Sequence, residues 1–155
     1  MRIRIVAVGQ RMPRWVDDAF EDYRRRFAKP YAVELVELKA AIRGEARDVD
    51  KLLNDEAQRI VSATQGFHAV ALDERGVAWT TQKLAERLTR WRDEAQDAAF
   101  VIGSADGLHP SVKRSAADVV SLSAMTLPHA LVRVVLIEQL YRAVSVAMGH
   151  PYHRE

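Results

Sequence analysis

The 155-residue sequence contains no cysteine. This absence excludes disulfide bonds, thiolate zinc sites and a cysteine nucleophile, and it suits a reducing compartment. The sequence also lacks the apolar run of roughly 18 residues that a membrane-spanning helix needs, and its start lacks the apolar segment of a signal peptide. We therefore expect a cytoplasmic protein that has no membrane partner.

Two common nucleotide-binding signatures are missing as well. Gly103 and Gly107 have the wrong spacing for a dinucleotide fingerprint, and no Gly-Lys-Ser/Thr follows them to form a P-loop. No acidic pair is placed to hold Mg²⁺, and we expect no metal. The first strand ends in Gly9-Gln10 instead of carboxylates, which argues against a signalling receiver. These absences disfavour a nucleotide-dependent oxidoreductase or phosphotransferase.

The composition is that of an ordinary globular protein, with 48% hydrophobic and 28% charged residues, and its length fits one domain over residues 1–155. The net charge of +2 is unevenly spread, because residues 1–47 hold 11 Lys/Arg against 7 Asp/Glu and residues 48–155 hold 12 against 14. The run Arg24-Arg25-Arg26 lies in the basic part. It forms either a phosphate-facing patch or a solvated helix face.

Strand-like and helix-like segments alternate along the chain. Helices are expected to begin after Pro13, near Thr81 and after Pro110. The third of the expected strands ends at a turn-like segment, Asp73-Glu74-Arg75-Gly76. This order predicts an α/β fold with a mostly parallel sheet flanked by helices. The other expected helices span residues 48–64 and about 128–148, and the expected strands span residues 3–8, 31–38 (at an edge), 67–72, 98–102 and 119–122.

Ligands of parallel sheets collect at the carboxyl ends of the strands. One such end is Leu72-Asp73, and another is the glycine loop, residues 103–107, where Gly103 either lets a ligand approach the backbone or simply shapes a turn. The third is the apolar loop, residues 122–127. Its side chains offer little polar chemistry beyond Ser123 and Thr126, which leaves recognition of a flat adenine edge to backbone groups. Thr126 alternatively caps the last helix, and both interpretations can hold together.

These segments resemble the ribosomal large-subunit methyltransferase H family, which belongs to the SPOUT class. The similar segments cover the chain from end to end. They are Val6-Ala7-Val8-Gly9 with Met12-Pro13, Leu72-Asp73, Ile102-Gly103 to Gly107-Leu108, Ser121 to His129, Leu131-Val132-Arg133-Val134, Leu140-Tyr141-Arg142-Ala143 and His150-Pro151-Tyr152-His153-Arg154-Glu155.

The resemblance implies a parallel α/β sheet whose C-terminal segment forms a deep trefoil knot. It also implies a homodimer that uses S-adenosyl-L-methionine, without a metal, to methylate N3 of a pseudouridine. The implied substrate is a stem-loop of large-subunit rRNA in the assembled ribosome. The implied cofactor residues are Leu72, Gly103, Leu122, Ser123, Ala124, Met125, Thr126 and Leu127.

The glycine loop departs from the family pattern, which commonly reads glycine-glycine-proline-glutamate-glycine where this chain has Gly103-Ser104-Ala105-Asp106-Gly107. If the second position needs a positive φ, Ser104 costs about 1–2 kcal/mol there. This departure is the one feature that favours the alternative function, a non-catalytic RNA-binding or ribosome-associated domain of the same fold.

The candidate catalytic residues lie near the C-terminus. His153 has the chemistry of a general base, Arg154 can pair with phosphate or steady an oxyanion, and Tyr152 can stack on an exposed base. Arg142 and Arg133 are expected to face the same cleft, and the alternative to a functional role for the terminal His153-Arg154-Glu155 is a frayed tail. The last helix is apolar on several faces, so we expect part of it to pack on a second subunit.

Overall fold

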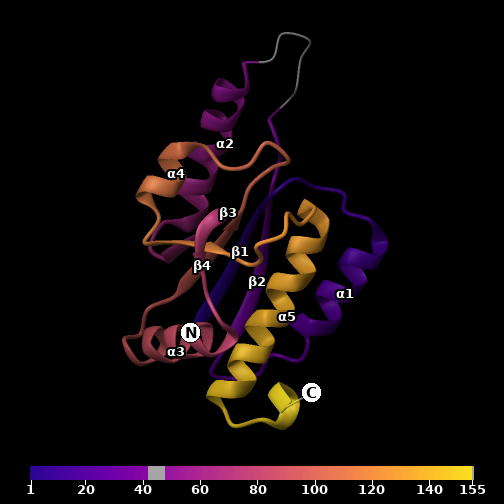
Figure 1. The fold of residues 1–155 in the computed structure, drawn as a ribbon, viewed down its shortest axis with the longest axis vertical. Coiled ribbons are helices and arrows are strands. Elements are labelled where there is room, and N and C mark those ends of the chain that lie inside the picture. Colours follow the sequence, from indigo (N-terminus) through magenta and orange to yellow (C-terminus); the bar gives the residue numbers. More distant parts are fainter. Residues whose placement is uncertain (42–47, 155) are drawn as a thin grey trace.

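The computed structural model describes residues 1–41 and 48–154, and for residues 153 and 154 only the backbone (Figure 1). Strands and helices alternate along the chain, as the sequence predicts. The strands are β1 (Arg2–Val8), β2 (Ala32–Leu38), β3 (His68–Ala78), β4 (Ala98–Ile102) and β5 (Asp118–Ser121). The helices are α1 (Arg14–Arg24), α2 (Val49–Thr64), α3 (Thr81–Asp93), α4 (Pro110–Ser115), α5 (His129–Ala147) and the short 3₁₀ helix η1 (Pro151–Arg154).

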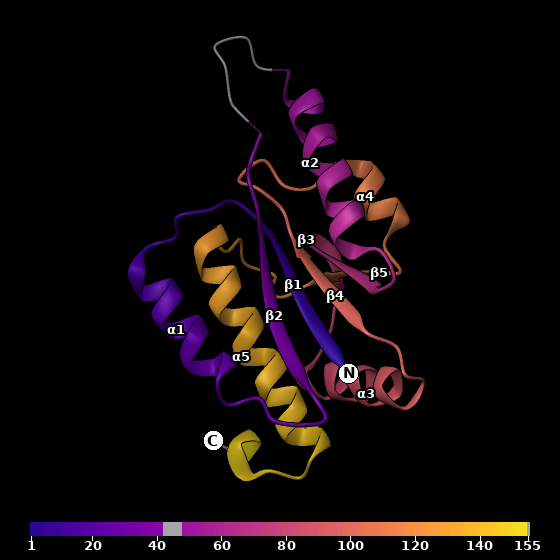
Figure 2. The same cartoon turned by 180° about the vertical axis from the view of Figure 1, so that it is seen from behind.

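All five of these strands pair in parallel in one sheet of order β2-β1-β4-β3-β5. The edge position expected for the second strand is therefore confirmed. Helices cover both faces of the sheet, and Figures 1 and 2 show the two sides of the resulting three-layer arrangement. The expected α/β fold class is confirmed, whereas the trefoil knot stays a prediction.

Each face of the sheet has its own apolar core. On one face, α1, α3 and α5 pack around side chains such as Ile5, Phe100 and Leu140. On the other face, α2 and α4 pack on Val6 and Val101. Because β1 and β4 are central strands with side chains buried on both sides, β4 is wholly apolar and β1 is apolar after Arg4, as expected of a covered parallel sheet.

β3 differs from its prediction, because it continues through the expected turn at Asp73-Glu74-Arg75-Gly76 to Ala78. Its pairing with β5 shifts between Leu72 and Val77, so the intervening residues form an irregularity within the strand. Gly76 is necessary there, because a Cβ atom at this position would lie 2.6 Å from the backbone carbon of Val120. The irregularity directs Asp73 to Arg75 toward the carboxyl edge of the sheet, where they line a cavity.

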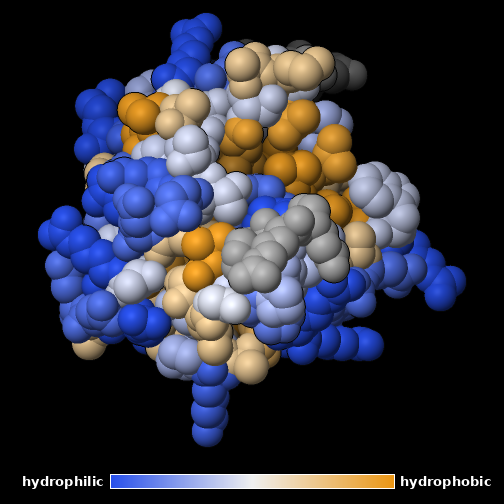
Figure 3. Space-filling view, turned by 60° about the horizontal axis from the view of Figure 1, so that its bottom comes forward, coloured by the Kyte–Doolittle hydropathy of each residue, from blue (hydrophilic) through white to orange (hydrophobic). Residues whose placement is uncertain are grey.

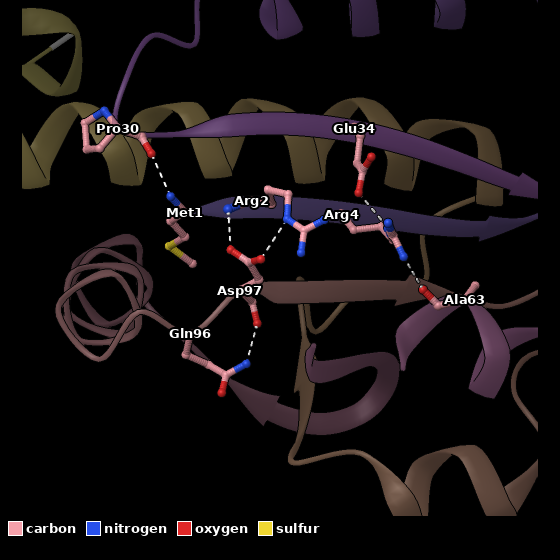
Figure 4. A network of polar contacts seen from close by, with 8 residues as sticks. All are labelled: Met1, Arg2, Arg4, Pro30, Glu34, Ala63, Gln96 and Asp97. Atoms are coloured by element: carbon pink, nitrogen blue, oxygen red, sulfur yellow. Dashed lines mark hydrogen bonds and ion pairs between the residues drawn. The ribbon is translucent and has the colours of Figure 1, made fainter. Parts of the chain in front are cut away.

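At the opposite end of the sheet from the cavity, polar contacts join the amino ends of the strands (Figure 4). The backbone N–H and the guanidinium of Arg2 both donate to the Asp97 carboxylate, at 2.6 and 2.7 Å. Arg4 donates to Glu34 and to the carbonyl of Ala63. These arginines are thus engaged in holding strands and helices together. Among the described residues, no helix is both long enough and apolar enough to cross a membrane.

Candidate functional site

A cavity of about 830 Å³ lies at the carboxyl ends of β4 and β5, between the irregular segment of β3 and the start of α5. Its size falls within the range typical of small-molecule sites. The walls come from the β3 irregularity, the glycine loop and the apolar loop, together with the first turn of α5. The lining residues are Leu72, Asp73, Glu74, Arg75, Ile102, Gly103, Ser104, Ala105, Asp106, Gly107, Leu108, Lys113, Ser121, Leu122, Ser123, Met125, Thr126, Leu127, Pro128, His129 and Val132.

The glycine loop forms a tight turn in one wall of the cavity. The N–H of Gly107 donates to the carbonyl of Ser104 at 2.9 Å, and Gly107 has a φ of 86°. At Gly103, a Cβ atom would lie 2.5 Å from the carbonyl oxygen of Gly107, closer than real Cβ atoms approach. Gly103 is therefore required for the turn itself, whether or not a ligand also approaches its backbone.

Ser104 is not strained in this turn. Among the described non-glycine residues, only Arg11 and Ala95 have a positive φ, so the condition for a conformational cost at Ser104 is not met. Its hydroxyl instead donates to the carboxyl group of Glu56 on α2, at 2.9 Å. The serine is accommodated by a partner that glycine could not engage.

The apolar loop is shaped by its own hydroxyl groups. Ser121 donates to the carbonyl of Ser123 at 2.8 Å, and the Ser123 hydroxyl accepts from the N–H of Met125 at 2.9 Å. The N–H groups of Thr126 and Leu127 make no hydrogen bond within the described chain. Both residues line the cavity, so a molecule bound there is a candidate partner for these donors.

The suggestion that Thr126 caps the last helix is wrong. The N-cap of α5 is Pro128, which makes no side-chain cap bond, and the Thr126 hydroxyl donates to Glu74 at 3.2 Å. This contact joins the apolar loop to the β3 irregularity across the cavity rim.

Asp73 and Lys113 form an ion pair in the wall, with 2.9 Å between the carboxylate and the ammonium group. Burial acts to raise the pKa of Asp73, but the hydrogen bonds from Lys113 and from the N–H of Arg75 outweigh it and lower the pKa below its usual value. Asp73 is consequently a fixed anion at neutral pH. The sequence offers no signal for this pair, because Lys113 lies 40 residues away on α4.

His129 lies at the start of α5, where it lines the cavity and neighbours a buried arginine. Burial, and then the charge of Arg133, lower its pKa, against an opposing contribution from the Gly103 backbone. His129 is therefore neutral at physiological pH. The Arg133 side chain is only 1% exposed and donates to Glu37 and to the carbonyl of Gly9. Arg133 is thus a structural residue, and the expectation that it faces the catalytic cleft is wrong.

The C-terminal residues lie against α5 and α1. The Tyr152 hydroxyl hydrogen bonds with Tyr23 at 3.2 Å and with Glu138 at 3.3 Å. The guanidinium of Arg142 lies 4.9 Å from the centre of the Tyr152 ring and pairs with Glu138 at 2.7 Å. The C-terminus is therefore docked as far as Tyr152, and that part is not a frayed tail.

Two of the four predicted catalytic residues, Tyr152 and Arg142, do not lie at the cavity of their own protomer. Glu138, to which both bind, lies nine residues beyond His129, about 13 Å along the helix axis. His153 and Arg154 belong to η1, but their side chains lie outside the described residues. Of the eight predicted cofactor residues, only Ala124 does not line the cavity.

Taken together, these features define an α/β protein with a parallel sheet and a cavity of small-molecule size at the carboxyl ends of its strands. Residues 1–153 match a family described as "Predicted SPOUT methyltransferase". The chain is 46% identical to the ribosomal RNA large subunit methyltransferase H of Burkholderia mallei over 155 residues, with 99% of each chain covered. The chain therefore belongs to the SPOUT methyltransferase family, within the group of large subunit methyltransferase H proteins.

Solved structures show the same fold at low sequence identity. A methylase family protein of Neisseria gonorrhoeae has a TM-score of 0.58 at 14% identity, covering 90% of this chain and 81% of its own. A methylase family protein of Haemophilus influenzae has a TM-score of 0.59 at 14% identity, and the match covers 97% of this chain and 69% of that protein. As a methyltransferase, the protein needs a methyl donor.

Proposed function

We propose that this enzyme transfers a methyl group from S-adenosylmethionine to N3 of a pseudouridine in large-subunit rRNA of the assembled ribosome. We place this activity in a cytoplasmic homodimer. The observation that carries the proposal is the cavity at the carboxyl edge of the sheet, walled by the glycine loop and the apolar loop. The rRNA substrate is supported by the name of the 46%-identical relative.

The cavity residues suit the proposed donor. An adenine ring can lie between aliphatic side chains such as Leu72, Leu122 and Leu127, while the free N–H groups of Thr126 and Leu127 meet its polar edge. S-adenosylmethionine supplies a methyl group already activated by the positive charge on sulfur. The chain's main task is then to align the acceptor with that methyl group, and alignment alone can contribute about 7–11 kcal/mol.

The acceptor nitrogen carries a proton at neutral pH, so the enzyme must remove it or stabilise the resulting anion. Tyr152 is unsuited to act as the base, because burial and the hydrogen bond with Tyr23 raise the pKa of its phenol above the ordinary value of 10. We assign removal of this proton to His153, which acts as the general base. We assign contact with phosphate or with the developing oxyanion to Arg154. Tyr152 and Arg142 hold the C-terminal residues in place.

We infer that these assignments need a second subunit, because Tyr152 and Arg142, beside the last residues, lie away from the cavity of their own protomer. Reacting atoms must approach to about 3–3.5 Å. Half-buried aliphatic side chains remain along α5, among them Leu131, Val134 and Val135. Figure 3 shows apolar side chains gathered on one face of the molecule. We propose that α5 packs on a second copy, whose C-terminal residues complete the site.

The test is transfer of radiolabelled methyl from S-adenosylmethionine to ribosomes that lack this modification. Free 23S rRNA and ribosomes whose RNA contains uridine at the target position serve as controls. We expect label only on the pseudouridine of assembled large subunits. RNA binding without cofactor binding would instead establish the non-catalytic alternative.

A further inference from the structure

Glu56 is a buried carboxyl group that the proposed chemistry does not use. It lies on α2 and is only 4% exposed. One oxygen accepts the N–H of Ala41 at 3.0 Å, just after β2. The other accepts the hydroxyl of Ser104 at 2.9 Å, in the glycine loop. A buried carboxyl group is costly unless its oxygens are hydrogen bonded, so both contacts matter to the fold around it.

Through Ser104, this carboxyl group reaches the wall of the cavity. The Ser104 side chain donates to Glu56, while its carbonyl accepts the N–H of Gly107 and closes the turn. Both Ser104 and its neighbour Gly103 line the cavity. The glycine loop is thereby attached to α2 at the residue that also closes its turn.

We propose that Ser104 is a positioning residue for the methyl donor, and that it acts by anchoring the glycine loop to Glu56. The inference rests on the proposed cofactor site. The contact depends on the hydroxyl group, which a glycine or an alanine at this position would lack. Loss of the hydroxyl leaves one Glu56 oxygen without its donor and the loop without this attachment. The loop then pays an ordering cost when the donor binds.

The experiment measures binding of S-adenosylhomocysteine by calorimetry, together with KM for S-adenosylmethionine and kcat. The variants are Ser104→Ala, Ser104→Thr, Glu56→Gln and the double variant Ser104→Ala/Glu56→Gln. Ser62→Ala is the matched control, because Ser62 also lies on α2 and its hydroxyl bonds only the carbonyl of Gln58 at the surface. Thermal unfolding of every variant reports on stability separately.

We expect Ser104→Ala to raise Kd and KM for the cofactor about fivefold while kcat stays within twofold, which is the effect of one lost hydrogen bond. Ser104→Thr keeps the hydroxyl and should bind like the wild type. In the Glu56→Gln background, Ser104→Ala should cost less than it does alone, because the two side chains act as a pair. Ser62→Ala should change neither constant.

A Kd within twofold of wild type for Ser104→Ala, whether or not its melting temperature falls, would overturn the inference and leave Ser104 a purely structural residue. If Ser104→Ala does not fold, Glu56→Leu takes its place, because leucine offers no acceptor to the Ser104 hydroxyl, and a Kd equal to that of wild type would overturn the inference too. A wild-type protein that binds no S-adenosylhomocysteine would refute the proposed function, and this inference with it.

Discussion

At the scale of single residues, the glycine loop is the most constrained part of the cavity. We expect Gly103→Ala to destabilise the fold by about 1–3 kcal/mol, because its methyl group would lie 2.5 Å from the Gly107 carbonyl oxygen. Displacement of the loop should also weaken cofactor binding at least tenfold. Urea unfolding and calorimetry measure the two effects. Gly66→Ala is the control, since it has a φ of 80° and open space around it, and it should leave cofactor affinity unchanged.

Arg133 illustrates a charged residue whose role could not be read from the sequence. Its position on an apolar helix suggested a cleft-facing cation, but only the fold shows that Glu37 and Gly9, distant in the chain, surround it. We expect Arg133→Met to lower the free energy of unfolding by about 2–4 kcal/mol, since Glu37 and the Gly9 carbonyl lose their donor. Arg14→Met, on an exposed side chain, should change it by less than about 0.5 kcal/mol. Equal effects of the two substitutions in urea unfolding would contradict this account.

At the scale of elements, the basic run on α1 has a simple explanation in the structure. Arg24 and Arg25 pair with Glu21, and Arg26 pairs with Asp22, at helical spacings of three and four. The acidic partners offset most of the local charge, which favours the solvated helix face over a phosphate-binding patch. We expect the triple variant Arg24→Ala, Arg25→Ala and Arg26→Ala to reduce ribosome methylation less than twofold at moderate salt. A large loss with a smaller salt dependence would restore the phosphate-binding interpretation.

Local patterns were sufficient to predict most of the secondary structure, because a buried parallel strand and an amphipathic helix each leave a clear periodicity. β4 was predicted with its observed bounds, and α2 begins after Asp48, whose side chain caps it. The end of β3 was missed because Asp73 to Gly76 have turn chemistry, whereas their pairing depends on close approach to Val120. Only tertiary contact, which a local pattern does not contain, decides such a case.

The difference between local pattern and tertiary contact also decides which part of the site could be predicted. Strand ends and loop composition indicated the cavity walls, because topology brings the carboxyl ends of parallel strands together. The contacts Lys113–Asp73 and Ser104–Glu56 join residues 40 and 48 positions apart, and no spacing rule connects them. The separation of Tyr152 from the cavity likewise depends on the docking of η1 against α1 and α5.

At the scale of the whole molecule, His129 links stability to pH. Because its pKa is lowered in the folded protein, the imidazole is neutral in both states above its ordinary value of about 6.5. Below that pH, the unfolded chain binds a proton that the folded chain binds less readily, so the free energy of unfolding falls as the pH drops. We expect this loss to be smaller in His129→Asn. The measurement is the free energy of unfolding in urea at several pH values between 7 and 5. If it falls by the same amount in the variant and in the wild type, His129 is not the cause.

In the proposed dimer, each active site consists of the cavity of one subunit and the C-terminal residues of the other. A variant that ends at His150 should bind S-adenosylhomocysteine but not methylate ribosomes. A Gly103→Ala variant should have the opposite defect, with an impaired cavity and intact C-terminal residues.

Heterodimers formed from the truncated variant and Gly103→Ala contain one intact cavity and one intact C-terminus, and these two belong to different subunits. Random mixing should therefore recover about a quarter of the wild-type activity. If the sites were complete within single protomers, no mixture would exceed the activity of its components, and a monomer by light scattering would exclude the arrangement altogether.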